Sequence, residues 1–120
     1  MTLSVVLAVA SHEFAGISET INRGEGFSVC GRTTSLGRGV RLVRKKSPDL
    51  FLMEMGMADP PTMKAIRTVC STPRTRVVVL CRVQEAASAV VALEAGANGY
   101  LFSDAAPSDV LRTLKLMARR

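Results

Sequence analysis

The sequence predicts an α/β domain in which five parallel strands form one sheet and helices cover both of its faces. Short runs rich in β-branched residues alternate with longer segments of helical periodicity, which is typical of repeated βα units. The run Val77-Val78-Val79-Leu80 is apolar without alternation, as expected for a strand buried on both faces. The 120 residues, of which 48% are hydrophobic and 22% charged, suit a single domain over residues 1–120.

Five strands are expected from these short runs. They cover Leu3–Val9, Phe27–Cys30, Leu50–Met53, Arg76–Leu80 and Gly99–Phe102. The first run also resembles the apolar part of a signal peptide, but no positive residue precedes it, so we interpret it as a buried strand.

The helices show the complementary period of three to four residues. The first and last apolar stripes consist of Phe14, Ile17 and Ile21, and of Val110, Leu111, Leu114 and Met117. Pro61 lies near the expected start of the third helix and Gly96 follows the fourth. Pro107 opens the fifth, which ends at Arg119 and Arg120.

Composition limits the compartment and the partners. No run approaches the roughly 18 apolar residues of a membrane helix, so we expect no membrane contact. Cys30, Cys70 and Cys81 indicate neither a disulfide framework nor a zinc site, which favours a reducing, cytoplasmic location.

The formal net charge of +6 includes one basic cluster. It consists of Arg38, Arg41, Arg44, Lys45 and Lys46. The cluster is either a nucleic-acid patch or the solvated face of the second helix. The solvated face is the simpler interpretation, because the few aromatic residues do not interleave with the charges.

The segment Pro48–Glu54 is the strongest functional signal. It is an apolar run that ends on a carboxylate. In open α/β sheets, ligands bind at the carboxyl ends of the strands, so the sequence predicts a site at Glu54.

Three segments resemble the receiver domain of response regulators. Pro48–Glu54 resembles its third strand, Arg76–Cys81 its fourth, and Ala95–Asp104 the "aGAxGYLxKd" segment found in receivers of LuxR/NarL-type transcription factors. The resemblance covers nearly the whole chain. It implies a CheY-like, flavodoxin-like (βα)5 three-layer sandwich with strand order 2-1-3-4-5. It also implies two-component signal transduction and a C-terminal DNA-binding output domain that is not present in this chain.

The resemblance also implies where a phosphorylation site would lie. Such a receiver holds magnesium between an acidic pair and a phosphoacceptor aspartate, and a Ser or Thr and a Lys bind the phosphoryl group. By position, the acidic pair falls on Ala10 and Ser11, the phosphoacceptor on Glu54, the Ser/Thr on Cys81 and the Lys on Ser103. None of these matches, so we expect no metal, no cofactor and no phosphorylation of Glu54. The substitutions suggest a pocket that has lost both its acids and its cation.

Two interpretations of Glu54 stay open. It is either a solvated remnant at the mouth of a vacated pocket or a constitutive mimic of phospho-aspartate. The mimic is the weaker interpretation, because the Cys81 thiol is a weak hydrogen-bond donor and Ser103 has no positive charge to pair with an anion. His12, the only histidine, is interpreted as a residue at a helix start and not as a metal ligand.

We therefore expect a protein that is not an enzyme: an atypical pseudo-receiver that regulates transcription by protein interaction. A homodimer would form through the face of Tyr100, the position of the family's switch aromatic, or through the first and fifth helices. Tyr100 is equally well explained as an edge aromatic that packs on the fourth helix. DNA would be contacted only through the output domain.

Two other classes of function are alternatives to this one. In the first, the vacated mouth near Ala10, Ser11, Cys81 and Ser103 admits a small ligand, or an unidentified protein partner binds. In the second, the fold binds a flavin, dinucleotide or cobalamin. Residues 11–15 lack the glycine-rich or Ser/Thr-rich loop and the other residues that such cofactors need, which disfavours this class.

Overall fold

The computed structural model describes residues 2–55 and 60–118, and it has the predicted alternation of strands and helices. The strands are β1 (Leu3–Ala8), β2 (Phe27–Thr33), β3 (Leu50–Glu54), β4 (Arg76–Cys81) and β5 (Gly99–Phe102). The helices are α1 (Ala15–Arg23), α2 (Leu36–Lys46), α3 (Pro60–Cys70), α4 (Ala86–Glu94) and α5 (Pro107–Ala118). Two 3-10 turns, η1 (His12–Phe14) and η2 (Val83–Glu85), precede α1 and α4.

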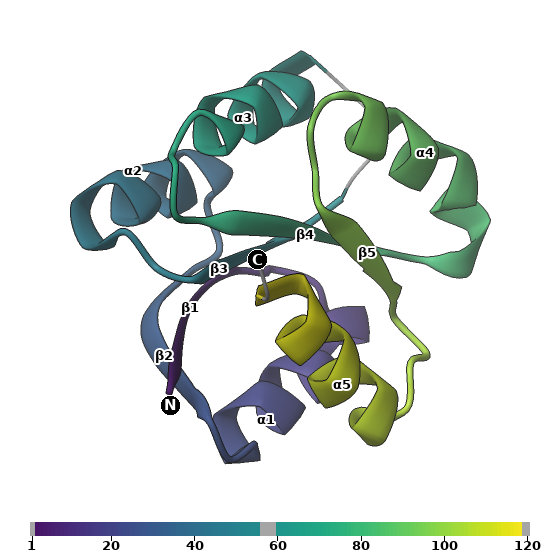
Figure 1. The fold of residues 1–120 in the computed structure, drawn as a ribbon. Coiled ribbons are helices and arrows are strands. Elements are labelled where there is room, and N and C mark those ends of the chain that lie inside the picture. Colours follow the sequence, from purple (N-terminus) through teal and green to yellow (C-terminus); the bar gives the residue numbers. More distant parts are fainter. Residues whose placement is uncertain (1, 56–59, 119–120) are drawn as a thin grey trace.

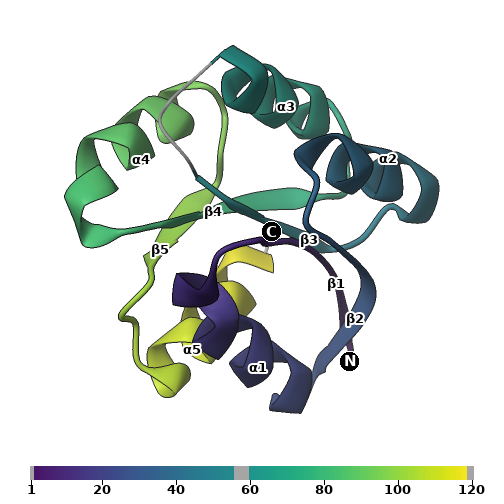
Figure 2. The ribbon, with the colours of Figure 1, turned by 180° about the vertical axis from the view of Figure 1, so that it is seen from behind.

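The five strands form one parallel sheet in the order β2-β1-β3-β4-β5, which confirms the predicted flavodoxin-like topology. Helices α2, α3 and α4 cover one face of the sheet, and α1 and α5 cover the other (Figures 1 and 2). The central strands are therefore enclosed on both sides. In β3, the residues Leu50 to Met53 are fully buried, as their unbroken apolar sequence predicts.

Alternate residues of the strands point to opposite faces of the sheet and pack into two separate hydrophobic cores. Val6 and Phe51 pack on the side of α2, α3 and α4. Val5 and Leu7 pack on the side of α1 and α5, together with Phe14, Ile17 and Ile21. The predicted apolar stripes are thus confirmed as core-facing, although Phe14 lies in η1 and not in α1.

Strand ends differ from the prediction by at most one residue, except in β2. That strand continues past Cys30 to Thr33, because Gly31, Arg32 and Thr33 pair with Val6, Leu7 and Ala8 after a shift of register. These residues are polar or small since β2 is an edge strand, and such a sequence gives no apolar signal.

Helix boundaries follow local chemistry. Ser35 caps α2 by accepting a hydrogen bond from the backbone N–H of Arg38 (3.3 Å). Gly96, with a φ of 118°, ends α4 as expected, and Pro107 opens α5. Arg119 and Arg120, the predicted basic end of α5, lie outside the described residues.

Helix α2 lies close to the sheet at Gly39. A Cβ atom there would meet Ala8 and the ring of Phe51 at 3.1 Å, so any larger residue would require these neighbours to shift by a few tenths of an ångström. Within residues 2–55 and 60–118, no helix combines the length and the apolarity that crossing a bilayer requires.

Candidate functional site

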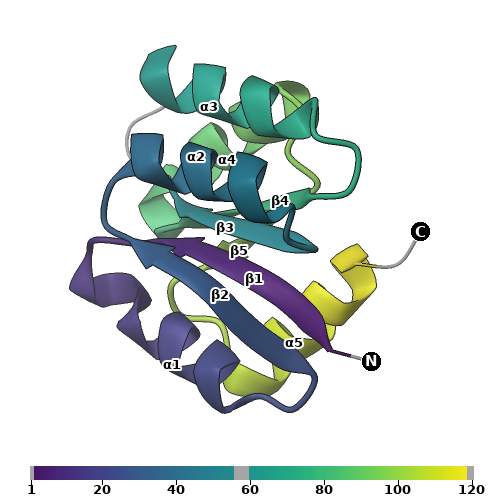
Figure 3. The same ribbon diagram turned by 90° about the vertical axis from the view of Figure 1, so that its left-hand side faces the viewer.

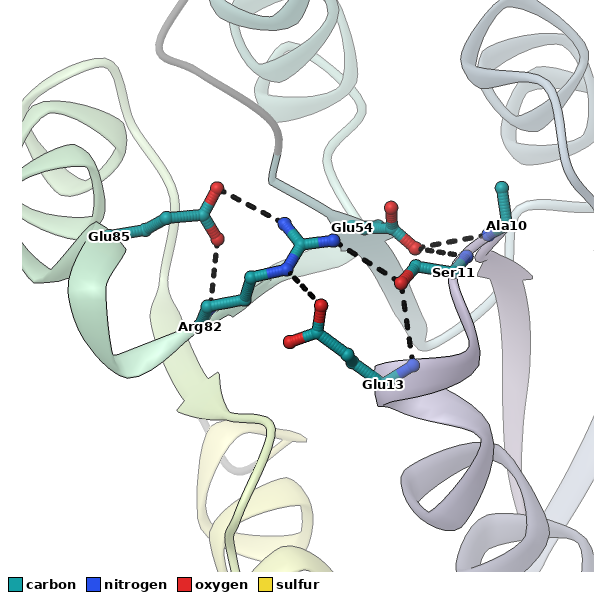
Figure 4. A network of polar contacts seen from close by, with 6 residues as sticks. All are labelled: Ala10, Ser11, Glu13, Glu54, Arg82 and Glu85. Atoms are coloured by element: carbon teal, nitrogen blue, oxygen red, sulfur yellow. Dashed lines mark hydrogen bonds and ion pairs between the residues drawn. The ribbon is translucent and has the colours of Figure 1, made fainter.

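The carboxyl ends of β1, β3 and β4 meet at one edge of the sheet. Ala8 is in register with Met53, and Glu54 with Leu80, so the residues that follow these strands lie side by side. The predicted positions Ala10, Ser11 and Glu54 are thereby brought together, as expected for the site of an open α/β sheet. Figure 4 shows them with Glu13, Arg82 and Glu85.

Glu54 is half-buried and has definite partners. Its Oε1 accepts hydrogen bonds from the backbone N–H groups of Ala10 (3.1 Å) and Ser11 (2.8 Å). Both donors lie in the segment between β1 and η1, so the carboxylate ties the end of β3 to the end of β1. The interpretation of Glu54 as a solvated remnant therefore needs correction, since two backbone donors hold the side chain in place.

Arg82, the first residue after β4, places a guanidinium in the middle of this site. Its Nε donates to Glu13 (2.6 Å), and its two terminal nitrogens donate to Glu85 (3.3 Å) and to the hydroxyl of Ser11 (3.2 Å). The guanidinium also lies over the ring of Phe14, 5.6 Å from its centroid. The side chain is only 23% exposed, so these contacts fix the cation between β1 and β4.

Three neighbouring acids stabilise the positive charge of Arg82. The hydrogen bond to Glu13, with the charges of Glu13, Glu85 and Glu54, raises the pKa of the guanidinium above its ordinary value. Glu85 also accepts from the backbone N–H of Arg82 (2.8 Å), which fixes the start of η2. The lysine position of the family holds Ser103, but Arg82 supplies a cation to this site from the end of a different strand.

Ser11 connects the two halves of the site. Its hydroxyl accepts from the backbone N–H of Glu13 (3.3 Å) and so caps η1, while it also accepts from Arg82. The neighbouring His12 begins η1 and is exposed, which agrees with its interpretation as a helix-start residue.

Cys81 and Ser103 lie at the ends of β4 and β5. Burial, with a smaller contribution from the charge of Glu85, raises the pKa of the Cys81 thiol to about 11, so the thiol is protonated at neutral pH. The backbone N–H of Ser103 donates to the carbonyl of Cys81 (2.9 Å). Within the described residues, neither side chain is a hydrogen-bond partner of Glu54.

Tyr100 faces outward from β5. Its side chain is 41% exposed, and its ring meets that of Phe102 edge-on at a centroid distance of 5.3 Å. The ring therefore contributes to the surface of the molecule next to α4.

The donor set at the strand ends does not fit magnesium. Ala10 offers no side-chain oxygen, the Ser11 hydroxyl already accepts two hydrogen bonds, and Oε1 of Glu54 already accepts two. Magnesium prefers several hard oxygen ligands in octahedral geometry, and here it would also face the Arg82 guanidinium. Within residues 2–55 and 60–118, no three His, Cys, Asp or Glu side chains are arranged to hold a metal ion.

The cavity that reaches the site is lined by neither Cys81 nor Ser103. It has a volume of about 370 Å³ and runs from Ala10, Ser11 and His12 along α1 to Arg32 and Thr33 of β2. A ligand bound there would contact the β1 loop and helix α1.

Sequence reasoning found the strand ends but missed Glu13, Arg82 and Glu85. Two signals were available. Arg82 directly follows the apolar run of β4, and Glu85 lies three residues later, where one turn brings it back to Arg82.

Comparisons with known proteins agree with this fold. The model of the response regulator receiver domain matches residues 11–115. The nitrate/nitrite response regulator NarL of Escherichia coli K12 is 27% identical over 117 residues, covering 92% of this chain and 53% of that protein. The response regulator UvrY of the same strain is 30% identical over 113 residues, covering 92% of this chain and 52% of that protein.

The chain thus spans about half the length of these curated relatives. A solved signal receiver domain of NarL from Mycobacterium tuberculosis superposes with a TM-score of 0.85 at 22% identity, covering 98% of this chain and 96% of that chain, and so has the same fold. Because the family model matches nearly the whole chain, the protein belongs to the response regulator receiver domain family.

Proposed function

We propose that this receiver domain works without phosphorylation, as a regulatory interaction and dimerisation module of a LuxR/NarL-type transcription regulator. Its DNA-binding output half, its cytoplasmic location and the absence of catalytic activity are parts of the same proposal. Receiver domains of response regulators are regulatory modules, and NarL and UvrY are relatives of this kind.

The position of Arg82 carries this proposal. In a phosphorylatable receiver, a divalent ion neutralises the charge that develops during phosphoryl transfer. Here the guanidinium of Arg82 lies among Ser11, Glu13 and Glu85, with the charge of Glu54 nearby. This fixed internal cation bonds to Glu13, Glu85 and Ser11 and neutralises part of the negative charge that a metal ion would otherwise balance.

The geometry of Glu54 supports the same conclusion. An acyl phosphate would form on a carboxylate oxygen, and the two backbone donors that engage Oε1 leave only Oε2 for that reaction. The longer side chain also displaces the reacting atoms by roughly a bond length, and an error of about 1 Å can cost on the order of a hundredfold in rate. The role as a phospho-aspartate mimic gains little support, because the partners of Glu54 lie on the β1 side.

The dimerisation part of the proposal depends on an apolar surface over α4 and β5. The exposed large hydrophobic residues of the described chain lie between Val83 and Leu116. Those on η2, α4 and β5 are Val83, Val90, Val91, Leu93 and Tyr100. Such a surface fits an interface with a second copy of this chain, because exposed apolar residues mark interaction sites and these side chains carry no charge that would be repelled across a two-fold axis. By contrast, Ile17, Ile21 and Leu114 on α1 and α5 are buried in the core.

A phosphodonor experiment tests the phosphorylation part. The chain is incubated with magnesium and acetyl phosphate or beryllofluoride, and intact mass and melting temperature are followed. We expect no phosphoryl mass and no magnesium-dependent rise in melting temperature. A mass gain in the wild type that is absent from Glu54→Gln would overturn the proposal.

Sedimentation velocity tests the dimer. We expect a dimer that Val90→Asp converts to a monomer, because Val90 is 55% exposed at the centre of α4 and a charge there would be desolvated at the interface. The matched change Leu116→Asp, on the equally exposed apolar residue of α5, should leave the dimer intact. A monomer at high concentration in the wild type contradicts this part of the proposal.

The second candidate function is ligand sensing, and the cavity beside Ala10, Ser11 and His12 favours it. Helix α1 and the end of β2 contribute its other walls. A metabolite screen by melting temperature, repeated with Ser18→Leu to fill the cavity, tests it: a true ligand should stabilise only the wild type.

A further inference from the structure

The net positive charge of this protein arises in one segment. Residues 26–48 contain six cations and no acid, and the ten other Lys and Arg residues are balanced by ten Asp and Glu. The six are Arg32, Arg38, Arg41, Arg44, Lys45 and Lys46. Such segregation is not needed for solubility, which mixed charges serve equally well.

The fold gathers these cations on one edge of the molecule. β2 is the edge strand of the sheet and α2 lies beside it (Figure 3). All six side chains are exposed. Between them runs a groove of about 530 Å³, lined by Arg32, Arg38, Arg41 and Lys45 together with Thr33 and Thr34.

The cations of this basic groove lack acidic partners. Among the described residues, none of the six takes part in an ion pair. Arg32 donates to the side-chain oxygen of Asn22, and Lys46 donates to the carbonyl of Cys30 (2.5 Å). Their charges therefore repel one another across the groove, and an anionic ligand would relieve that repulsion.

We infer that the β2–α2 groove binds the phosphate backbone of double-stranded nucleic acid without reading its bases. Arg38, Arg41 and Lys45 follow one another at steps of three and four, so they lie along one face of α2. They span about 10 Å of helix. Duplex DNA carries one negative charge per about 1.7 Å of its axis, so this row faces several phosphates.

The groove chemistry favours phosphate. Arginine presents a planar fork of donors that matches phosphate oxygens, and three of the four cations that line the groove are arginine. The hydroxyl of Thr34 adds a neutral donor of the kind common in backbone contacts, whereas the hydroxyl of Thr33 already donates to the carbonyl of Ser35 (3.4 Å).

The scarcity of exposed apolar and aromatic side chains favours duplex nucleic acid over an acidic protein or a single strand as the ligand of this groove. Within the described residues, no large hydrophobic side chain between 26 and 48 is exposed, and the half-buried Leu42 is the one apolar residue that lines the groove, so an acidic protein would find little apolar surface to pack on. Phe27, the one aromatic residue of the segment, is buried, so no base can stack there and a single strand would gain nothing over a duplex. The inference does not depend on the proposed dimerisation.

Fluorescence anisotropy with a labelled duplex of arbitrary sequence tests the inference on the 120-residue chain. We expect a dissociation constant of roughly 1–100 µM at 150 mM salt that rises steeply with salt. Arg38→Gln/Arg41→Gln should weaken binding about tenfold or more and reduce the log–log salt slope by about two. Arg41→Gln/Lys45→Gln should behave alike, which guards against a local folding defect in one variant.

The control variant has the same net charge as the groove variants, but its two cations are removed from other parts of the surface. Arg67→Gln/Lys115→Gln changes two exposed side chains on α3 and α5 and should alter affinity less than twofold. Equal losses in the control and the groove variants would overturn the inference, because binding would then follow net charge alone. So would the absence of binding at 50 mM salt, or tighter binding of poly-glutamate than of DNA.

Discussion

The two ends of strand β3 each carry a carboxylate that accepts hydrogen bonds from β1 or from the segment that directly follows β1. At the amino end, Asp49 accepts from the backbone N–H (2.8 Å) and hydroxyl (3.2 Å) of Ser4. At the carboxyl end, Glu54 accepts from the backbone N–H groups of Ala10 and Ser11. The acid at the family's phosphorylation position thus makes the same kind of contact as a plainly structural one.

The cations at the two ends differ. Arg74 donates two hydrogen bonds to Asp49, at 3.1 and 3.0 Å, so one acid meets one cation. Arg82 instead forms its ion pairs with Glu13 and Glu85, and Glu54 adds a third negative charge nearby. At the amino end, which we call the clamp, the charges of Asp49 and Arg74 balance. At the carboxyl end, three acids surround a single internal cation.

Removing the clamp at the amino end should have the largest effect on stability. Asp49 is 20% exposed, and Asp49→Ala leaves the Ser4 N–H without its acceptor, so we expect a loss of about 2 kcal/mol. That corresponds to a melting shift of about 8 °C, measurable by calorimetry. Arg74→Ala should cost below about 1 kcal/mol, because Arg74 is 60% exposed. Equal effects of the two variants would mean that the ion pair, and not the link to β1, stabilises this end.

The same carboxylate gives the amino end a pH dependence. Partial burial alone raises the pKa of Asp49, but the hydrogen bonds from Ser4 and Arg74 outweigh it and hold the pKa below its ordinary value. The folded state therefore binds this proton less well than the unfolded state. Its stabilisation is complete above about pH 4, the ordinary range, and is lost as pH falls through the lower folded pKa. Urea unfolding from pH 6 to pH 2.5 should show a shallower acid loss in Asp49→Asn.

At the carboxyl end, Glu54→Ala should cost about 1 kcal/mol, less than Asp49→Ala, because water can reach the freed N–H groups of the exposed Ala10 and half-buried Ser11. Glu54→Gln keeps an acceptor and should cost about half as much. Urea unfolding measures both. If Glu54→Ala is as stable as the wild type, the two hydrogen bonds contribute nothing and the solvated-remnant interpretation returns.

The strand β3 and the site at its carboxyl end could be predicted from the sequence. The unbroken apolar run before Glu54 predicts a central strand, and the position of the acid predicts a site at the carboxyl ends of the strands. The resemblance to receiver domains adds Ala10 and Ser11 to that site. The inferences of the strand and of the site depend on periodicity and on a general property of parallel sheets. The polar end of β2 escaped them, because Arg32 and Thr33 pair along an edge strand that buries little.

The role of Arg82 could not be predicted in the same way. A charged residue in a short connection is normally solvated, and only the folded sheet brings it against Ser11 and Glu13, about seventy positions earlier in the chain. Local sequence fixes the contact with Glu85 alone. The balance of charge at the site therefore needed the three-dimensional arrangement of β1 and β4.

The smallest expected effect is a salt-dependent change in melting temperature, and it tests the balance of charge around Arg82 directly. Arg82→Gln leaves Glu13, Glu54 and Glu85 without their shared cation, so their repulsion should lower the melting temperature at low salt. Raising the ionic strength from 10 mM to 1 M shortens the Debye length from about 30 to about 3 Å and should close part of the gap to the wild type. Arg74→Gln is the matched control at the amino end, where Asp49 has no second acid among the charges that shift its pKa, so salt should not rescue it. If salt rescues both variants alike, the two ends of β3 do not differ in charge balance. If it rescues only Arg82→Gln, the carboxyl end is an acidic site whose cation is built into the chain.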